Sequence, residues 1–208
     1  MRKKKLYKCF ILASFLMLGF IASAFAHEGH AGHEGHEMPM NTEPKKVNVE
    51  LPVVSMIRQD GKKVDFPAEV ADGRLTVVSF IYTSCQTICP ATSQTFLKLQ
   101  EKLASQDKSV HLVSISIDPE NDTLPKLLQY AEKYHANKNW NFYTGSAEAS
   151  ITLQKRFGVY QGDKMNHAPV YFIQGASLDK WTRIDGLVTA DFLLSTIRQI
   201  SERNDDKK

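Results

Sequence analysis

The sequence contains few cysteines, three in 208 residues, and one of them, Cys9, lies in an N-terminal leader. The other two, Cys85 and Cys89, are so close together that a disulfide between them would close too small a loop to stabilise folding much. A small domain held together by disulfides is therefore excluded. Apolar residues make up 42% of the chain and charged residues 24%, ordinary values for a globular domain with its own core. The cysteine pair is thus expected to serve chemistry rather than stability.

The chain also lacks a usable excess of positive charge. Its formal net charge is +3, but five of the 26 basic residues lie within the first eight positions, ahead of any acidic residue. The remaining 21 basic residues face 23 acidic ones. The chain after its basic start therefore has no surplus of positive charge with which to neutralise phosphates, so nucleic-acid binding is not expected. No internal repeat is visible, and the length suits one domain behind a leader.

A long apolar run occurs once, at residues 10–25, directly after the basic start. Ala24 and Ala26 supply the small residues of a cleavage site, which predicts a signal peptide over residues 1–26. An uncleaved anchor is the alternative, because residues 9–26 number 18, just enough to span a bilayer. Either way the body is expected in the periplasm or another extracytoplasmic space, touching the membrane only through this segment if it is uncleaved.

Residues 27–46 have almost no aliphatic side chains to bury and are expected to form a flexible tail, which we call the His/Met tail. Imidazole binds Cu(II), Zn(II) or Ni(II), and thioether favours Cu(I), so its composition indicates a copper-collecting arm. A plain spacer is the alternative. The candidate auxiliary ligands are His27, His30, His33, His36, Met38 and Met40.

Residues 47–208 alternate between strand and helix patterns. Short apolar stretches on either side of Asp60 and Gly61 predict a β-hairpin over residues 51–66. Continuous β-branched and aromatic runs predict buried strands, and spaced apolar residues predict helices. We expect strands at 75–82, 110–117, 140–143, 170–173 and 181–184, and helices from 90 onward and at 123–136, 147–157 and 189–203. This order indicates an α/β sandwich of thioredoxin type with an N-terminal β-hairpin extension.

Cys85 follows a buried strand, and Cys89 directly precedes Pro90 at an expected helix start. There the N–H groups and the dipole should stabilise the Cys89 thiolate. The pair could form a disulfide or hold one soft ion, and thiolates select Cu(I) or zinc. Thiol–disulfide oxidoreductases of this fold usually have two residues between their cysteines, whereas three stand here. The spacing favours metal binding and leaves a redox-active pair as the competing interpretation.

Four stretches together resemble the Sco (SenC) family of copper-binding cytochrome c oxidase assembly proteins. They are FIYTSC at 80–85 leading into Cys89 and Pro90, SIDPENDT at 116–123, TGS at 144–146, and a histidine at 167 before a strand. The resemblance implies Cys85, Cys89 and His167 as copper ligands. It also implies a metallochaperone that delivers copper to the binuclear centre of an oxidase, with an oxidase subunit or another periplasmic copper protein as partner.

The chain departs from that family at two places. Gln86 and Thr87 stand where a proline and an acidic residue are common, which removes a negative charge beside the thiolates. Ala168 and Pro169 after the histidine look more like the cis-proline that faces the cysteines in thioredoxins. A thiol–disulfide oxidoreductase that reduces the cysteines of a copper-accepting partner is therefore the alternative function. A peroxidase of the same fold is a third and weaker interpretation of the function.

The remaining polar candidates have plainer interpretations. Asp118, Glu120 and Asp122 could form a metal cluster, but we expect Asp118 to shape a turn and Asp122 or Thr123 to cap the next helix. His111 in a strand and His135 in a helix are expected to be packing or surface residues.

Overall fold

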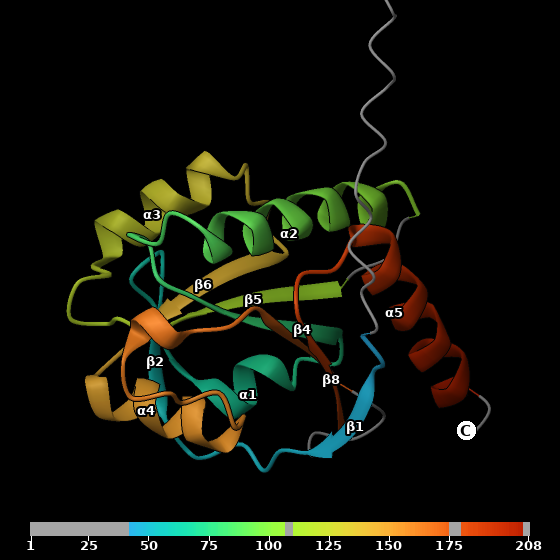
Figure 1. The fold of residues 1–208 in the computed structure, drawn as a ribbon, viewed down its shortest axis with the longest axis horizontal. Coiled ribbons are helices and arrows are strands. Elements are labelled where there is room, and N and C mark those ends of the chain that lie inside the picture. The colour runs from blue at the N-terminus through green and yellow to red at the C-terminus, as the bar shows by residue number, and fades with distance from the viewer. Residues whose placement is uncertain (1–41, 107–109, 175–179, 206–208) are drawn as a thin grey trace, which may run out of the picture. The chain divides into compact units, whose positions relative to one another are not determined.

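A computed structural model describes residues 42–106, 110–174 and 180–205, and its chain order confirms the alternating pattern (Figure 1). The elements are β1 (Lys45–Asn48), β2 (Ser55–Arg58), β3 (Lys63–Asp65), α1 (Phe66–Val70), β4 (Leu75–Ile81), α2 (Ile88–Ala104), β5 (Val110–Ser116), α3 (Leu124–Lys133), β6 (Trp140–Thr144), α4 (Ala147–Arg156), a 3₁₀ turn (Lys164–Asn166), β7 (Val170–Gln174), β8 (Lys180–Asp185) and α5 (Ala190–Asp205). The leader and the candidate ligands of the His/Met tail lie outside the described residues.

One mixed sheet organises these elements, with the strand order β1-β8-β7-β4-β5-β6-β2-β3. The central strands β4, β5 and β6 are parallel, whereas β7 runs antiparallel to β4 and β8 antiparallel to β7. The predicted hairpin is present, because β2 pairs with β3 and also extends the sheet along β6. The thioredoxin-like α/β sandwich with its hairpin extension is confirmed.

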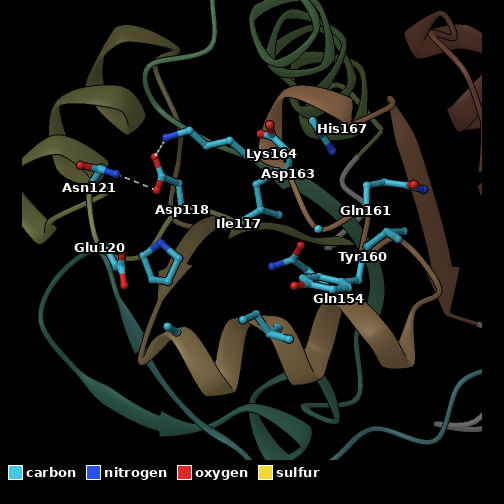
Figure 2. Close-up of a pocket in the computed structure, with 15 residues that line it drawn as sticks. Ile117, Asp118, Glu120, Asn121, Gln154, Tyr160, Gln161, Asp163, Lys164 and His167 are labelled. Atoms are coloured by element: carbon cyan, nitrogen blue, oxygen red, sulfur yellow. Dashed lines mark hydrogen bonds and ion pairs between the residues drawn. The ribbon is translucent and has the colours of Figure 1, made fainter.

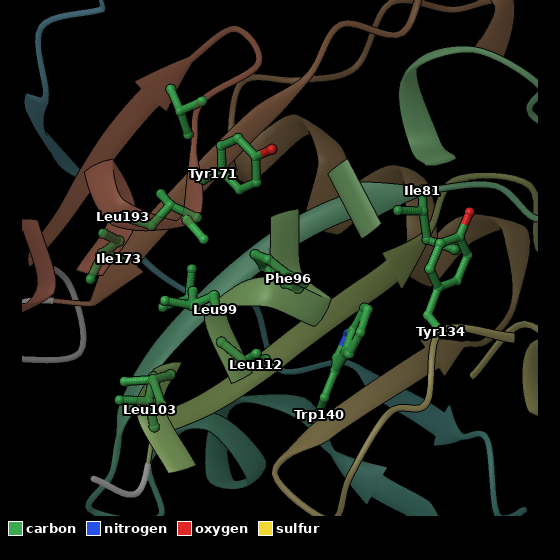
Figure 3. Packing of buried hydrophobic residues seen from close by; sticks show 14 of the residues in the cluster. Ile81, Phe96, Leu99, Leu103, Leu112, Tyr134, Trp140, Tyr171, Ile173 and Leu193 are labelled. Atoms are coloured by element: carbon green, nitrogen blue, oxygen red, sulfur yellow. The ribbon is translucent and has the colours of Figure 1, made fainter. Parts of the chain in front are cut away.

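Helices cover both faces of the sheet (Figure 1). Alternation along β4 sends Val77 into one hydrophobic cluster, shared with α2, α3 and α5, and Val78 into the other, shared with α1 and α4. Figure 3 shows the first cluster, where Phe96 and Leu99 of α2 pack over Leu112 of β5. Removing such a buried side chain typically costs about 2–5 kcal/mol, so this packing fixes α2 on the sheet.

Some boundaries differ from the sequence prediction. β1 begins at Lys45, inside the expected tail, and pairs with β8 as an edge strand. α3 ends at Lys133, so His135 lies beyond the helix, exposed, with a φ of 49°. α2 begins at Ile88, which places Pro90 inside its first turn. The turn expected around Gly175 is outside the described residues.

Three loops meet at one edge of the sheet. β4 and β5 both end there, and β7, which runs the opposite way, begins there. The segments 82–87, 117–123 and 158–169 are therefore brought together, although they are far apart in sequence. This is the edge at which open α/β sheets place their sites. None of the helices in the described ranges is both long and apolar enough to span a membrane.

Candidate metal and thiol site

The two cysteines lie on either side of the start of α2. Cys85 is half-buried in the loop after β4, and its N–H donates to the Tyr82 carbonyl over 3.2 Å. Cys89 is fully buried in the first turn of α2. Its backbone N–H points at the other thiol, with 3.4 Å between the Cys89 nitrogen and the Cys85 sulfur. Both thiols are free, so the pair is available for metal binding or for thiol exchange.

The structure separates the two thiols by their pKa. Partial burial acts to raise the pKa of Cys85, but the N–H groups of Cys89 and Thr87, the Cys89 thiol and the Tyr82 hydroxyl outweigh it and lower that pKa from 9.0 to about 7. Burial raises the pKa of Cys89 well above the ordinary value. The prediction that the helix start stabilises the Cys89 thiolate is therefore wrong, because those N–H groups face Cys85 instead.

His167 ends the 3₁₀ turn and is buried, with 7% of its surface exposed. Burial lowers its pKa, and a hydrogen bond to the backbone of Phe80 only partly offsets this, so the imidazole is neutral near pH 7. Its Nε2 atom has no hydrogen-bond partner. A ring held through one nitrogen, with the other left free, is the arrangement typical of a metal-binding histidine.

Tyr82 connects the three predicted ligands. Its N–H donates to the Cys89 sulfur over 3.5 Å, and its carbonyl accepts from the Cys85 N–H over 3.2 Å. Its ring packs edge-on against His167, with 6.4 Å between the ring centroids. Nevertheless, no three His, Cys, Asp or Glu side chains in the described ranges are arranged to hold a metal ion. Cys85, Cys89 and His167 are neighbours that must approach one another further to share one.

Comparison with known proteins decides the family. The model of the SCO1/SenC family matches residues 51–201, most of the chain. The chain belongs to this family. A SCO1 protein homolog of Bacillus subtilis is 36% identical over 106 residues, which cover 50% of this chain and 54% of that protein. The mitochondrial SCO1 homolog 1 of Arabidopsis thaliana is 31% identical over 108 residues, covering 51% of this chain and 31% of that protein. The chain thus spans about half or less of these relatives.

Solved Sco structures agree with the fold. The structure of BsSco, a member of the Sco family of cytochrome c oxidase assembly proteins in which a disulfide switch was identified, is 29% identical. It superposes with a TM-score of 0.64 over 77% of this chain and 96% of its own. ScoI of Arabidopsis thaliana with copper bound, 22% identical, has a TM-score of 0.63 over 78% of this chain and 98% of its own. Copper is thus the metal bound in the structure of a similar Sco protein.

Asp122 anchors the cysteine loop of this Sco chain, a role that sequence analysis missed. Its buried carboxylate accepts from the Thr83 N–H over 3.0 Å, from the Thr83 hydroxyl over 2.6 Å and from the Ser116 hydroxyl over 2.6 Å. Thr123 does occupy the position before α3, but its side chain makes no capping hydrogen bond. The expectation that Asp122 or Thr123 caps this helix by its side chain is wrong, because Asp122 is engaged across the sheet edge.

Lys164 ties the histidine turn to the acidic loop, and it too was missed. Its ammonium pairs with the Asp118 carboxylate and lies over the Tyr82 ring, 5.5 Å from the centroid. Asp118 also accepts from the Asn121 side chain over 2.8 Å, so the prediction that it shapes this turn is confirmed. The ion pair links the segments that carry the acidic motif and the histidine.

A cavity of about 600 Å³ opens between these two segments and α4 (Figure 2). Asp118, Lys164 and His167 line one side, and Gln154 of α4 lines another. The cysteines are not among its lining residues. His167 therefore stands between the cavity and the thiol loop, with Tyr82 as its contact on the thiol side.

Proposed function

We propose that this Sco protein binds one Cu(I) ion through the sulfurs of Cys85 and Cys89 and the Nε2 atom of His167, and passes it to a copper-accepting subunit of a cytochrome c oxidase. The observation that carries the proposal is the unpartnered Nε2 of a buried, neutral His167 that packs on Tyr82. The Tyr82 N–H donates to the Cys89 sulfur, and the Tyr82 carbonyl accepts from the Cys85 N–H. A buried imidazole nitrogen without a partner is unfavourable unless it has a ligand to bind. Copper is the soft metal that two thiolates and an imidazole suit.

The separated pKa values support an ordered uptake of the ion. Cys85, with a pKa of about 7, is partly ionised at neutral pH and is the more exposed thiol, so it makes the first bond. Cys89 binds by releasing its proton to solvent, since a coordinating thiol must be deprotonated. His167 closes the site with a small movement of the segment 158–169. Reversing these steps by ligand exchange would release Cu(I) to an acceptor.

The location and partner are further parts of this proposal. The basic start and apolar run of residues 1–26 support export to the periplasm or another extracytoplasmic space. The description of BsSco as a cytochrome c oxidase assembly protein supports an oxidase subunit as the acceptor. The His/Met tail would collect copper ahead of the domain site.

Cu(I) titration against a competing chelator tests the site. The full exported chain should be used, with the six tail ligands His27, His30, His33, His36, Met38 and Met40 changed to alanine so that the tail does not mask the result. Cys85→Ser and Cys89→Ser should each abolish tight binding of one equivalent, and His167→Ala should weaken it. His135→Ala, an exposed histidine away from the site, is the matched control. If all three site variants bind like their parent, the proposal fails.

The pKa difference between the thiols also favours a second function, thiol–disulfide exchange. The Cys85 thiolate would attack one sulfur of a partner disulfide, forming a mixed disulfide and releasing one partner thiolate. Cys89, after losing its proton, would then attack the Cys85 sulfur, which releases the second thiolate and leaves a Cys85–Cys89 disulfide. Such a reductase requires both cysteines but not His167. Reduction of one equivalent of a peptide disulfide by the reduced His167→Ala variant at the parent rate, with none by Cys89→Ser, would support it.

A further inference from the structure

Met165 lies beside the thiol loop and is unusually exposed for an apolar residue. It is an apolar residue that is 70% exposed, and it lies two positions before His167. Its sulfur contacts the Tyr82 hydroxyl, with 3.7 Å between the oxygen and the sulfur. An exposed methionine gains little from burial, so packing does not explain its place.

The backbone, rather than the side chain's own packing, holds Met165 there. The Asp163 carboxylate accepts from the Met165 N–H over 2.9 Å, and the His167 N–H donates to the Lys164 carbonyl over 3.1 Å. The ion pair between Lys164 and Asp118 fixes the same turn from the other side. The turn is anchored on both flanks, so the backbone of Met165 stays near Tyr82 while its flexible side chain remains free to turn.

Tyr82 is a neighbour of both residues, because its hydroxyl lies 3.7 Å from the Met165 sulfur and its carbonyl accepts from the Cys85 N–H over 3.2 Å. Met165 and Cys85 therefore both lie against Tyr82. Cys85 is also the more exposed of the two thiols. The exposed side chain of Met165 and the half-buried thiol of Cys85 can therefore both be reached from solvent beside Tyr82.

We propose that Met165 is a thioether ligand on the path of Cu(I) into and out of the domain site, binding the ion together with Cys85 before Cys89 and His167 close around it. The inference rests on the proposed copper-binding function. A thioether is neutral and soft, and it favours Cu(I) over Cu(II). It can bind the ion transiently without adding charge. It therefore speeds ligand exchange and contributes little to the final affinity.

Stopped-flow transfer of Cu(I) to and from a bidentate Cu(I) chelator tests the proposal, in the full exported chain with the tail ligands changed to alanine. Met165→Leu keeps an apolar side chain of similar size and removes only the sulfur; Met165→Gln removes both sulfur and apolar character. Both should slow uptake and release together by about tenfold, the lower range for losing a residue that supports a metal site. Because uptake and release slow by the same factor, the equilibrium affinity should stay at the parent value.

Two results would overturn the inference. One is that Met165→Leu transfers Cu(I) at the parent rate. The other is that only Met165→Gln is slow, which would assign the residue an apolar contact and not a sulfur bond. NMR of methyl-labelled methionine adds a direct readout, because the signal missing from Met165→Leu should shift in the parent when one equivalent of Cu(I) is added. Failure of the parent to bind Cu(I) at all would instead reject the proposed function.

Discussion

The buried carboxylate of Asp122 accepts hydrogen bonds from both the backbone N–H and the hydroxyl of Thr83, over 3.0 and 2.6 Å. These two residues belong to different loops, one after β5 and one after β4. The contact therefore fixes the segment that carries Cys85 against the neighbouring strand end. The geometry of the thiol site depends on this contact as well as on the helix that holds Cys89.

Asp122→Asn should loosen the cysteine loop and destabilise the fold. An amide has one acceptor oxygen, so it cannot accept from Thr83 and Ser116 together, and its NH₂ group faces donors. An unsatisfied buried group costs about 1–3 kcal/mol, and we expect the free energy of unfolding in urea to fall by about that amount. Asp191→Asn, at an exposed ion pair with Lys102, is the control and should change stability little. Equal effects of the two variants would contradict the anchoring role.

Alkylation of the reduced, metal-free protein should distinguish the two thiols. Because the thiolate is the reactive form, the rate of iodoacetamide addition at Cys85 should rise with pH around a midpoint near the pKa of about 7. Cys89, buried and with a raised pKa, should stay unmodified in the folded protein. Tyr82→Phe should move the midpoint upward, since the hydroxyl contributes to lowering the Cys85 pKa. Mass spectrometry of each cysteine-containing peptide gives the rates, and a midpoint near 9.0 would contradict the structure.

Much of the fold could be predicted because its signals are local. The apolar runs of β4 and β5 and the turn at Gly61, where φ is 86°, indicate strands and a hairpin without knowledge of the rest. β1 could not be predicted, because its sequence KKVN has one apolar residue and it forms only by pairing with β8. A strand that depends on a distant partner leaves no periodic pattern.

The candidate site, like the fold, could be predicted from the sequence only in part. The position of the cysteines between a strand and a helix is visible in the sequence, and His167 came from resemblance alone. The predicted stabilisation of the Cys89 thiolate was wrong, because it depends on which thiol the N–H groups of the turn face. Asp122 and Lys164 were missed because their partners, Thr83 and Asp118, lie 39 and 46 positions away.

Buried His111 should make the fold less stable in mild acid. Burial, followed by the nearby Arg74, lowers its pKa below 6.5, and its Nε2 interacts with Asn141 over 3.1 Å. Below pH 6.5 the unfolded chain therefore takes up a proton that the native state does not bind, so stability present above this pH is lost as the pH falls. Urea unfolding at pH 7.5 and 5.5 measures the loss. His111→Gln should reduce it, whereas an undiminished loss would show that other groups cause it; His167, whose pKa is also lowered, would account for a remainder.

Lys164→Gln should weaken copper binding more than it weakens the fold. Its ammonium is partly exposed, and exposed ion pairs contribute little to stability, so the urea midpoint should move little. The same ion pair, however, holds the turn from which His167 must meet the thiols, and a freer turn places that nitrogen less often within reach of the ion. We therefore expect lower Cu(I) affinity in the chain with its tail ligands removed, measured by chelator competition. Lys102→Gln, which removes an ion pair between α2 and α5, is the matched control. Should both variants bind Cu(I) equally well, the turn would not depend on Lys164 for its position.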